Sequence, residues 1–478
     1  MNWVQKILLR TLWYLNIILK VRQLGVTTFF CVLWLDDTLF SMHNSAIVAH
    51  TMDDAKKIFD DKVKYAWDRL PSWLKQEWEI DTSNVKMLKF RRGSDESYIY
   101  VGTGLRGGTN QNLLISELST LDQRYPEKAN EIITGALNTV HKGQIIVIES
   151  TSKGAFGQYY KLCKLAMQKM RDKVKLTAMD WKFHFFSWID EPGYNLSGDV
   201  FINREENDYF KEIEDKTKHT LTQEQKMWYI KKKETLGEKM FSEYPTIPEE
   251  AFKSATEGTY YTKIINKLFD KKQITLVPYD PRMLVHTFWD LGVGDAMTIG
   301  FVQFSQFEVR IIDYYENSGE GMPHYINVLK EKEYNYGTHN APHDIEAREL
   351  STGVSRLETA QKLGIIFQVV PNIGKEDGID ATRNMLPRCW IDKDNCKRLV
   401  EGLSEYRKKW NEPLGTFSNE PLHDWASHIA DMVRYIAVGM TQILPNSIGT
   451  EPLEDPEVLE ERRRHQEQNF DPFNIHIY

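Results

Sequence analysis

The sequence predicts an α/β protein made of two folded domains, and three observations lead to this prediction. The chain has 478 residues, which is too long for one ordinary hydrophobic core. The first ~160 residues alternate short apolar runs with helical stretches, whereas three closely spaced apolar runs follow a break about 85 residues further on. Hydrophobic residues make up 41% of the chain and aromatic residues 12%, so it does not have the composition of a disordered protein.

Short apolar runs in the first part are expected to be strands, because they alternate with helical segments. The runs are nearly free of polar residues, as strands buried on both faces are, so we expect a parallel sheet with helices on both sides. A helical run through Leu35 and a helix over Met52–Leu70 fit this arrangement, and Tyr159–Phe252 is expected to be helical and charged. The expected strands are Asn16–Leu19, Ala46–His50, Tyr98–Gly102, Leu113–Ser116 and Ile145–Ile148.

The segment after the first expected strand has the features of a phosphate-binding loop. In such loops backbone N–H groups at a helix N-terminus surround the phosphates. Compared with the pattern GxxxxGK[ST], Lys20 takes the place of the first glycine and Val26 that of the lysine. The positive charge would then come from Lys20 or Arg22, while Thr27 keeps the hydroxyl that holds Mg²⁺. The candidate nucleotide-binding residues of this loop are Lys20, Arg22, Gln23, Gly25, Thr27 and Thr28. The alternative is a strand–helix turn in which the glycine serves only packing.

Polar residues near later strand ends favour nucleotide binding and hydrolysis. The fourth strand is followed by Glu117, where a P-loop ATPase places the acid that orients and deprotonates the attacking water. Ser116 stands where an aspartate usually supports Mg²⁺. The last strand leads to Thr151, at the edge where ligands bind in open α/β sheets. Arg106, in a glycine-rich loop, is either an arginine finger or an exposed loop arginine. Together these features predict a P-loop ATPase domain of the RecA/ASCE-like kind.

The second domain begins with three strands joined by tight turns, the pattern of an antiparallel meander. A helix, a strand, another strand and further helices follow them. Three hairpin strands followed by alternating helices and strands are the order of ribonuclease H-like folds, which include resolvase-type nucleases. The expected elements are strands over Leu284–Leu291, Thr298–Phe304 and Phe307–Tyr315, a helix over Pro323–Glu333, a strand ending near Asp344, a strand over Ile365–Val370, and helices to Val438.

Three acids in this second domain predict a nuclease site with two metal ions. Asp290 ends the first, otherwise apolar strand, and a core-facing carboxylate without a partner would be costly. Asp344 follows a later strand, and Asp431 shares a helix stripe with His428 and Asp424 at spacings of i, i+4 and i+7. Such acids can hold two metal ions ~4 Å apart that stabilise the attacking and leaving oxygens. Oxygen-rich ligation favours Mg²⁺ or Mn²⁺. Asp424, at the start of its helix, is also suited to capping it.

The domain boundaries follow from where these patterns begin and end. We expect the ATPase domain over residues 1–252, with a helical subdomain over about 159–252, and a linker over 253–280. The nuclease domain is expected over 281–440, and 441–478 is expected to be a mobile tail.

Charge and hydropathy exclude several classes of protein. The net charge of −8 means that any grip on nucleic acid must be local, through basic patches and bound metal. No apolar stretch approaches the ~20 residues of a membrane-spanning helix, so no membrane association is expected. The start carries Lys6, Arg10 and Asn16 and lacks a small-residue cleavage site, so we expect the protein to stay where it is made. Four cysteines without CxxC spacing are expected to be reduced thiols.

In the order and spacing of these motifs the chain resembles the large terminase subunits of tailed bacteriophages, from about Asn16 to Met440. The loop from Lys20 is similar to their variant Walker A, and the end of the fourth strand at Glu117 to their Walker B. The resemblance implies that Arg106 is a trans-acting arginine finger. It further implies that Glu149-Ser-Thr151 couples hydrolysis to movement, that Tyr244–Phe252 closes the ATPase domain, and that Gln5, of Trp3-Val-Gln5, reads adenine.

The same resemblance implies a function for the whole chain. The nuclease acids would be Asp290, Asp344 and Asp431, with His428 as a further metal-site position. The cofactors would be ATP and Mg²⁺, with Mn²⁺ also accepted by the nuclease. A ring of subunits on the portal protein of the procapsid, working with the small terminase subunit in the bacterial cytoplasm, would translocate double-stranded DNA and cleave the concatemer. It would not remain in the mature virion.

Two alternatives remain open from the sequence. Val26 and Ser116 would also be found in a nucleotide site that no longer hydrolyses ATP, kept as a scaffold beside an active nuclease. A cellular helicase or repair ATPase with a fused resolvase-type nuclease is the other alternative, although no motifs of a second RecA-like domain are found.

Overall fold

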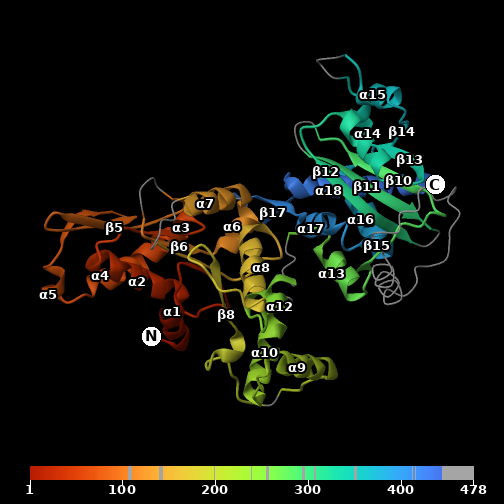
Figure 1. Ribbon diagram of the computed structural model, residues 1–478. Helices are drawn as coiled ribbons and strands as arrows, with labels where there is room; N and C mark the ends of the chain where they lie inside the picture. The colour runs from red at the N-terminus through yellow and green to blue at the C-terminus, as the bar shows by residue number, and fades with distance from the viewer. Residues whose placement is uncertain are drawn as a thin grey trace, which may run out of the picture. The chain divides into compact units, whose positions relative to one another are not determined.

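The computed structural model describes residues 1–443 apart from 85, 106–109, 139–143, 199, 238, 254–257, 293–295, 306–307, 349–352, 412 and 415. The chain forms two compact units, divided after residue 257 (Figure 1). Two features expected from the sequence, Arg106 and the tail from residue 444 onward, lie outside the described residues. No helix in the described part of the chain has the length and apolar character needed to cross a membrane.

The first unit is built on a mainly parallel sheet with the strand order β3-β4-β5-β2-β6-β7-β1-β8. From β5 to β8 all neighbouring strands are parallel, and β3 and β4 add an antiparallel edge. The strands are β1 (Leu15–Lys20), β2 (Ser45–Val48), β3 (Glu79–Ser83), β4 (Met87–Arg92), β5 (Asp95–Gly102), β6 (Asn112–Ser116), β7 (Ile145–Ser150) and β8 (Trp181–Phe186).

This strand order confirms the predicted fold class of the first unit. The strand before the candidate phosphate loop, β1, lies between β7 and β8, and β7 separates it from β6, which leads to Glu117. One strand inserted between these two is the arrangement of RecA/ASCE-like ATPases. The prediction that Tyr159–Phe252 is helical is wrong for Trp181–Phe186, because these residues form β8 and pair with β1.

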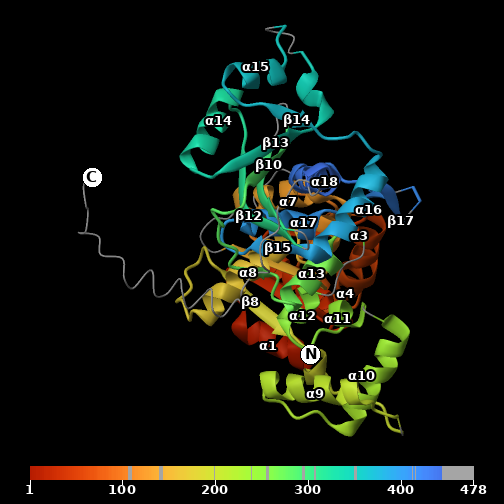
Figure 2. The same cartoon turned by 90° about the vertical axis from the view of Figure 1, so that its right-hand side faces the viewer.

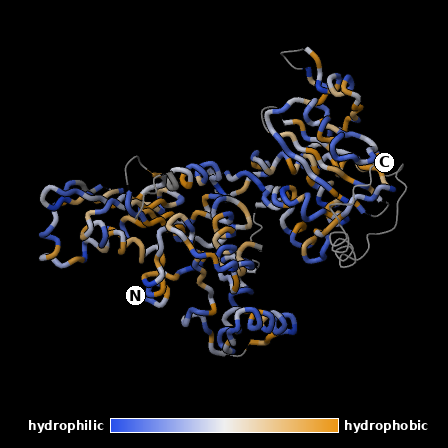
Figure 3. Tube along the Cα trace, viewed as in Figure 1, coloured by the Kyte–Doolittle hydropathy of each residue, from blue (hydrophilic) through white to orange (hydrophobic). Residues whose placement is uncertain are grey.

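Both faces of the first sheet are buried, as the apolar strands predicted. Alternate residues of β1 illustrate this: Ile18 belongs to one hydrophobic cluster, with residues of α1 and α2, and Ile17 and Leu19 to another, with residues of α6, α7 and α8. Period-two alternation of side chains places neighbouring residues on opposite faces. Figure 3 shows hydrophobic residues along the strands of each sheet.

The helices of the first unit include the expected segment Met52–Leu70, which is helical from Met52 to Asp68 with a π-helical turn in its middle. Helices α9 and α10 lie side by side in both views (Figures 1 and 2), with Tyr209 stacked on Tyr229. The helices are α1 (Trp3–Thr11), α2 (Val26–Phe40), α3 (Met52–Ile58), η1 (Phe59–Lys64), α4 (Tyr65–Asp68), α5 (Ser72–Lys75), α6 (Leu118–Arg124), α7 (Pro126–Asn138), α8 (Gly157–Arg171), η2 (Trp188–Asp190), α9 (Arg204–Thr217), α10 (Gln223–Leu236), α11 (Lys239–Glu243) and α12 (Pro248–Lys253).

The second unit contains a mixed sheet with the order β14-β13-β10-β11-β12-β15-β9 and a separate hairpin, β16–β17. Strands β10, β11 and β12 are antiparallel, and β13 and then β14 continue the sheet in parallel from β10. The strands are β9 (Ile274–Thr275), β10 (Val285–Asp290), β11 (Met297–Phe304), β12 (Val309–Asn317), β13 (Tyr336–Ala341), β14 (Phe367–Val369), β15 (Cys389–Asp392), β16 (Lys408–Asn411) and β17 (Thr416–Pro421).

A meander whose first strand is extended on its other side by two parallel strands is the ribonuclease H-like arrangement, so the predicted fold class is confirmed here too. The expectation of only helices between Val370 and Val438 is wrong, because β15, β16 and β17 lie there. Within the segment expected to be a linker, α13 and β9 form regular structure, and β9 pairs with β15.

Helices cover both faces of this second sheet. One face carries residues of α13, α16, α17 and α18, and the other carries residues of α14 and α15. Ala426 and Ala430 on α18 are fully buried, and these small side chains allow the helix to approach β10 and β11. The helices are α13 (Thr262–Asp270), α14 (Met322–Glu331), η3 (His343–Glu346), α15 (Arg356–Lys362), α16 (Lys375–Met385), η4 (Leu386–Arg388), α17 (Lys397–Glu405) and α18 (Trp425–Ile443).

Candidate functional sites

The candidate phosphate loop connects β1 to α2, at the carboxyl edge of the parallel strands. Gln23 and Gly25 have left-handed backbone conformations, with φ of 63° and 70°. Such residues turn successive N–H groups inward, and a loop of this kind before a helix N-terminus attracts anions. Val26, in the place of the usual lysine, is buried at 1% exposure, so its side chain contributes nothing to a phosphate.

Helix α1 braces this loop from outside the sheet. The side-chain amide of Asn2 donates to the carbonyl of Leu24 at 2.8 Å, and that of Gln5 donates to the carbonyl of Gly25 at 3.1 Å. The amide oxygen of Gln5 also accepts from the backbone N–H of Asn2, closing a capping box at the start of α1. The structure therefore gives Gln5, the candidate adenine reader, a role in holding the loop.

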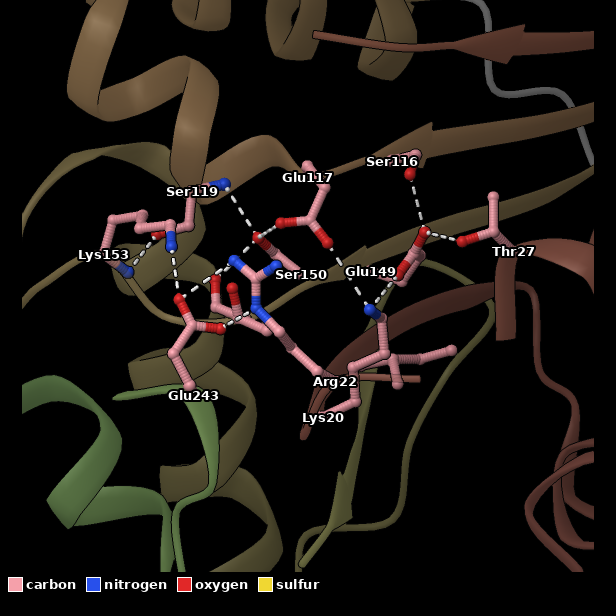
Figure 4. Close-up of polar contacts among 12 residues, drawn as sticks. Lys20, Arg22, Thr27, Ser116, Glu117, Ser119, Glu149, Ser150, Lys153 and Glu243 are labelled. Atoms are coloured by element: carbon pink, nitrogen blue, oxygen red, sulfur yellow. Dashed lines mark hydrogen bonds and ion pairs between the residues drawn. The ribbon is translucent and has the colours of Figure 1, made fainter. Parts of the chain in front are cut away.

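Lys20 is the cation of the loop, and it lies between two carboxylates (Figure 4). Its Nζ is 3.0 Å from Glu149 Oε2 and 3.4 Å from Glu117 Oε1. Burial alone would lower the pKa of Lys20, but the carboxylates of Glu149 and Glu117 outweigh it and raise that pKa well above its usual range. Lys20 is therefore charged and held at the edge of the sheet.

Glu149 is the centre of this polar cluster, and it was not among the residues selected from the sequence as binding or catalytic. Its Oε1 accepts hydrogen bonds from the hydroxyls of Thr27 and Ser116, each at 2.7 Å, and its side chain is fully buried. Burial would raise its pKa, but Lys20 and the two hydroxyls lower it below the usual range. The argument applied to Asp290, that an acid in an apolar strand needs a partner, would have identified Glu149 from the sequence.

Glu117 lies where the prediction placed it, directly after β6. Its φ of 60° puts a non-glycine residue in the left-handed region, a strained conformation that recurs at functional sites. The backbone N–H of Glu117 donates to the backbone carbonyl of Glu149 at 2.8 Å. The hydroxyl of Ser150 donates to the carboxylate of Glu117 at 3.3 Å. This geometry holds the Glu117 carboxylate beside Lys20.

The other predicted nucleotide-binding residues have different surroundings. The guanidinium of Arg22 is half-exposed and pairs with Glu243 at the end of α11, which also binds Lys153 Nζ at 2.9 Å. Thr28 is exposed on α2. Thr151 is buried after β7, and its hydroxyl has no hydrogen-bond partner among the described residues. Lys153 was not foreseen, because nothing in its local sequence marks it.

The second candidate site lies around the end of β10 in the second unit. Nδ1 of His428 lies 3.1 Å from Oδ2 of Asp290. The hydroxyl of Thr298, on β11, donates to the backbone carbonyl of His428 at 3.3 Å. Asp431, one helical turn along α18 from His428, pairs instead with Arg434 at 3.0 Å. Asp344 is exposed in η3 after β13.

The charges of the other two predicted acids act on Asp290. Burial raises the pKa of Asp290, the charges of Asp431 and Asp344 raise it further, and the hydrogen bond from His428 opposes them. Within the part of the chain that the structure describes, however, no three side chains of His, Cys, Asp or Glu are grouped closely enough to hold a metal ion. The carboxylates have the chemistry that Mg²⁺ and Mn²⁺ prefer, and their role as metal ligands stays a prediction.

Asp424 has a capping role in the structure. It precedes α18, its Oδ1 accepts from the backbone N–H of Ala426 at 3.0 Å, and its Oδ2 is 3.7 Å from the Arg407 guanidinium. These contacts are those of a helix-capping residue rather than of a metal ligand.

The second unit has a cavity of about 260 Å³, and Arg434 in its wall is the ion-pair partner of Asp431. Its wall includes the cationic side chains of Lys375 and Arg434 and the ring of Tyr435. The other lining residues are Pro342, His343, Val370, Pro371, Asn372, Ile373 and Val438. Positive charge in the wall of a cavity suits an anionic ligand such as a phosphodiester.

No known protein-family model matches the chain, and no curated protein matches it. Among solved structures it is similar to the large terminase of a thermophilic bacteriophage in complex with ADP, at 13% identity and a TM-score of 0.32, over 90% of this chain and 94% of that one. The ATPase domain of the Thermus phage P74-26 large terminase is similar at 17% identity and a TM-score of 0.33, over 52% of this chain and 93% of that one.

The nuclease domain of the large terminase of bacteriophage SPP1, with bound Mn, is similar at 14% identity and a TM-score of 0.27, over 33% of this chain and 86% of that one. At such identities and TM-scores, we base the function of this chain on its own residues.

Proposed function

We propose that the first unit binds and hydrolyses ATP at the β1–α2 loop. The observation that carries the proposal is the cluster of Lys20, Thr27, Glu117 and Glu149 at the carboxyl edge of a sheet with RecA/ASCE-like strand order. Ligands of open α/β sheets bind at this edge. A cation, a helix N-terminus and a carboxylate at one edge are what phosphoryl transfer to water requires.

Each residue of the cluster has a distinct role in this proposal. Lys20 supplies the positive charge that faces the β- and γ-phosphates, in place of the lysine that Val26 replaces. Glu117 orients and deprotonates the attacking water. Mg²⁺ bound with the nucleotide would neutralise the charge that develops on the phosphates, and the oxygen ligands at hand, Thr27 and Glu149, have the chemistry that Mg²⁺ prefers.

ATP turnover by point variants tests this proposal. Lys20→Ala and Glu117→Ala are each expected to lower kcat at least ~100-fold, because they remove a phosphate-facing charge and the general base. Lys6→Ala and Glu205→Ala, exposed residues outside the cluster, are matched controls expected to retain wild-type turnover. Wild-type turnover in both cluster variants would refute this site, whereas a wild-type chain that binds ATP without turnover would favour the scaffold alternative.

We further propose that the second unit cleaves DNA, with Asp290, Asp344 and Asp431 as its acids. Two observations support this assignment: burial raises the pKa of Asp290 on a ribonuclease H-like sheet, and the same unit has a cavity with Lys375 and Arg434 in its wall. Cutting of supercoiled plasmid in Mn²⁺ should fall at least ~100-fold in Asp290→Asn and Asp431→Asn. Asp380→Asn, an exposed acid of α16, is the control. Undiminished cutting by both site variants would remove this site.

For the whole chain we propose a DNA-packaging motor of the large terminase kind. The order of motifs along the chain supports it: phosphate loop, Glu117 and then the ribonuclease H-like unit. A ring of subunits would move double-stranded DNA into a procapsid through the portal protein, with the small terminase subunit, in the bacterial cytoplasm. ATP-dependent protection of DNA from added nuclease, in the presence of procapsids, measures this activity. No protection with wild-type protein that hydrolyses ATP would favour a repair ATPase–nuclease.

A further inference from the structure

The strand that leads to the catalytic-acid candidate lacks a charge that its position calls for. In P-loop ATPases of this strand order an acid at the end of the strand supports the nucleotide's Mg²⁺. Here that position is Ser116, whose hydroxyl has no charge to offer. A site that uses Mg²⁺ without an anionic oxygen at this point would be incomplete.

The structure places a carboxylate beside this serine from the neighbouring strand. Strands β6 and β7 are parallel and adjacent, and Ser116 is in register with Glu149. The Ser116 hydroxyl donates to Glu149 Oε1 at 2.7 Å. The charge missing from β6 is therefore present one strand closer to the phosphate loop, because β7 lies between β6 and β1.

The loop threonine points to the same oxygen. Thr27, at the start of α2, is the residue whose hydroxyl would bind Mg²⁺ in a P-loop, and it donates to Glu149 Oε1 at 2.7 Å (Figure 4). One carboxylate oxygen thus accepts from the loop hydroxyl and from the hydroxyl at the end of β6. In Figure 4 the side chains of Thr27, Ser116 and Lys20 converge on Glu149 from α2, β6 and β1.

Charge in the cluster leaves room for a cation. Glu149 is fully buried, and an uncompensated buried carboxylate is costly. Lys20 is within 4 Å of both Glu149 and Glu117, so two carboxylates share one ammonium group. The Thr151 hydroxyl, two residues after Glu149, is buried without a hydrogen-bond partner among the described residues, so the end of β7 also has an unused oxygen.

We propose that Glu149 supplies the anionic oxygen for the nucleotide's divalent cation, in place of the acid that Ser116 replaces. The assignment rests on the proposed ATP site and extends it, because Glu149 would act on the cation rather than serve only as the counter-ion of Lys20. Thr27 and Ser116 hold the carboxylate in position through their hydrogen bonds to it, and hydroxyl oxygens are also ligands of the kind that Mg²⁺ prefers.

A change of ligand chemistry separates these two roles. The affinity of the full chain for a fluorescent ADP analogue is measured in EDTA, in Mg²⁺ and in Cd²⁺, and the ratio of affinities with and without each cation gives the coupling. In Glu149→Cys a soft thiolate replaces a hard carboxylate oxygen, so the Mg²⁺ coupling should fall about tenfold or more while the Cd²⁺ coupling persists or rises. A counter-ion role predicts equal loss for both cations.

The matched control is Glu250→Cys, which replaces a half-buried glutamate of the same unit that accepts hydrogen bonds from the Tyr209 hydroxyl and the backbone N–H of Thr246. It should keep both wild-type couplings. The four natural cysteines are buried, which limits background binding of Cd²⁺. A Glu149→Cys protein with undiminished Mg²⁺ coupling, or with equal loss of both couplings, overturns the proposal. A wild-type chain that binds no ADP analogue in any condition refutes the ATP site itself.

A measurement on the wild-type chain covers the case in which Glu149→Cys does not fold. In this measurement ADP is bound and Fe²⁺ replaces Mg²⁺. Addition of ascorbate and peroxide then cuts the protein backbone near the bound Fe²⁺. Cuts at the end of β7 and at the start of α2 are expected, with none there when ADP is omitted. Cuts confined to other segments overturn the proposal.

Discussion

Gln5 offers a test that separates bracing of the phosphate loop from reading of the adenine base. Its side-chain amide donates to the carbonyl of Gly25 at 3.1 Å, and its amide oxygen accepts from the backbone of Asn2 at 3.0 Å. Gln5→Ala removes both hydrogen bonds and half of the capping box of α1. The perturbation therefore acts on the shape of the loop rather than on the base.

The magnitude follows from these two contacts. A hydrogen bond contributes ~1 kcal/mol net and a helix cap contributes a similar amount, so the first unit should lose about 1–2 kcal/mol of stability. Because a tenfold change in affinity corresponds to about 1.4 kcal/mol, a loss of this size should weaken nucleotide binding by at most about thirtyfold. The loss should be the same for ATP and for GTP, since the base takes no part in it.

Binding of fluorescent ATP and GTP analogues to Gln5→Ala, with urea denaturation of the same protein, measures these effects. Lys6→Ala, the exposed neighbour on α1, is the control and should match wild type in both assays. A variant that loses affinity for ATP but not for GTP, with unchanged stability, would show that Gln5 reads adenine and would refute the bracing role.

Three further predictions concern burial and charge. Lys20→Met should lower the free energy of unfolding by about 3–5 kcal/mol, because it leaves Glu149 buried without its cation. Adding Glu149→Gln should restore much of this stability, as measured by urea denaturation. A double variant that is less stable than Lys20→Met contradicts this. Asp424→Ala should lower stability by ~1 kcal/mol and leave Mn²⁺-dependent cutting intact, whereas loss of cutting without loss of stability would support metal binding. Burial lowers the pKa of His286 and of His339 from 6.5 to about 4, so both stay neutral when folded. The stability that these neutral histidines contribute is complete above pH 6.5 and falls as the pH drops toward 4. The loss should be about 2 kcal/mol for each histidine between pH 7 and pH 5. Faster hydrogen exchange of the β10 and β13 peptides at pH 5, after correction for the intrinsic rate, should show this loss.

The fold class could be predicted from the sequence because its signals are local. Runs such as Ile145–Ile148 are apolar at every position, as strands buried on both faces are, and the structure has β7 there. Strand β8 was missed because Trp181–Phe186 mixes lysine and histidine with aromatic residues inside a charged region. Its place in the sheet depends on pairing with β1, more than 160 residues earlier in the chain.

For the candidate sites, the sequence by itself determined which chemistry is present: a lysine before a glycine loop, a glutamate after an apolar strand, and acids spaced along one helix. Only the tertiary structure decided which of these groups meet. It gave Glu149 the central position because parallel pairing of β6 and β7 brings it beside Ser116, 33 residues away. It also paired Asp431 with Arg434 and turned Gln5 toward the loop. Hydrogen-bond partners depend on strand order, register and helix docking, and no local pattern of residues contains that information.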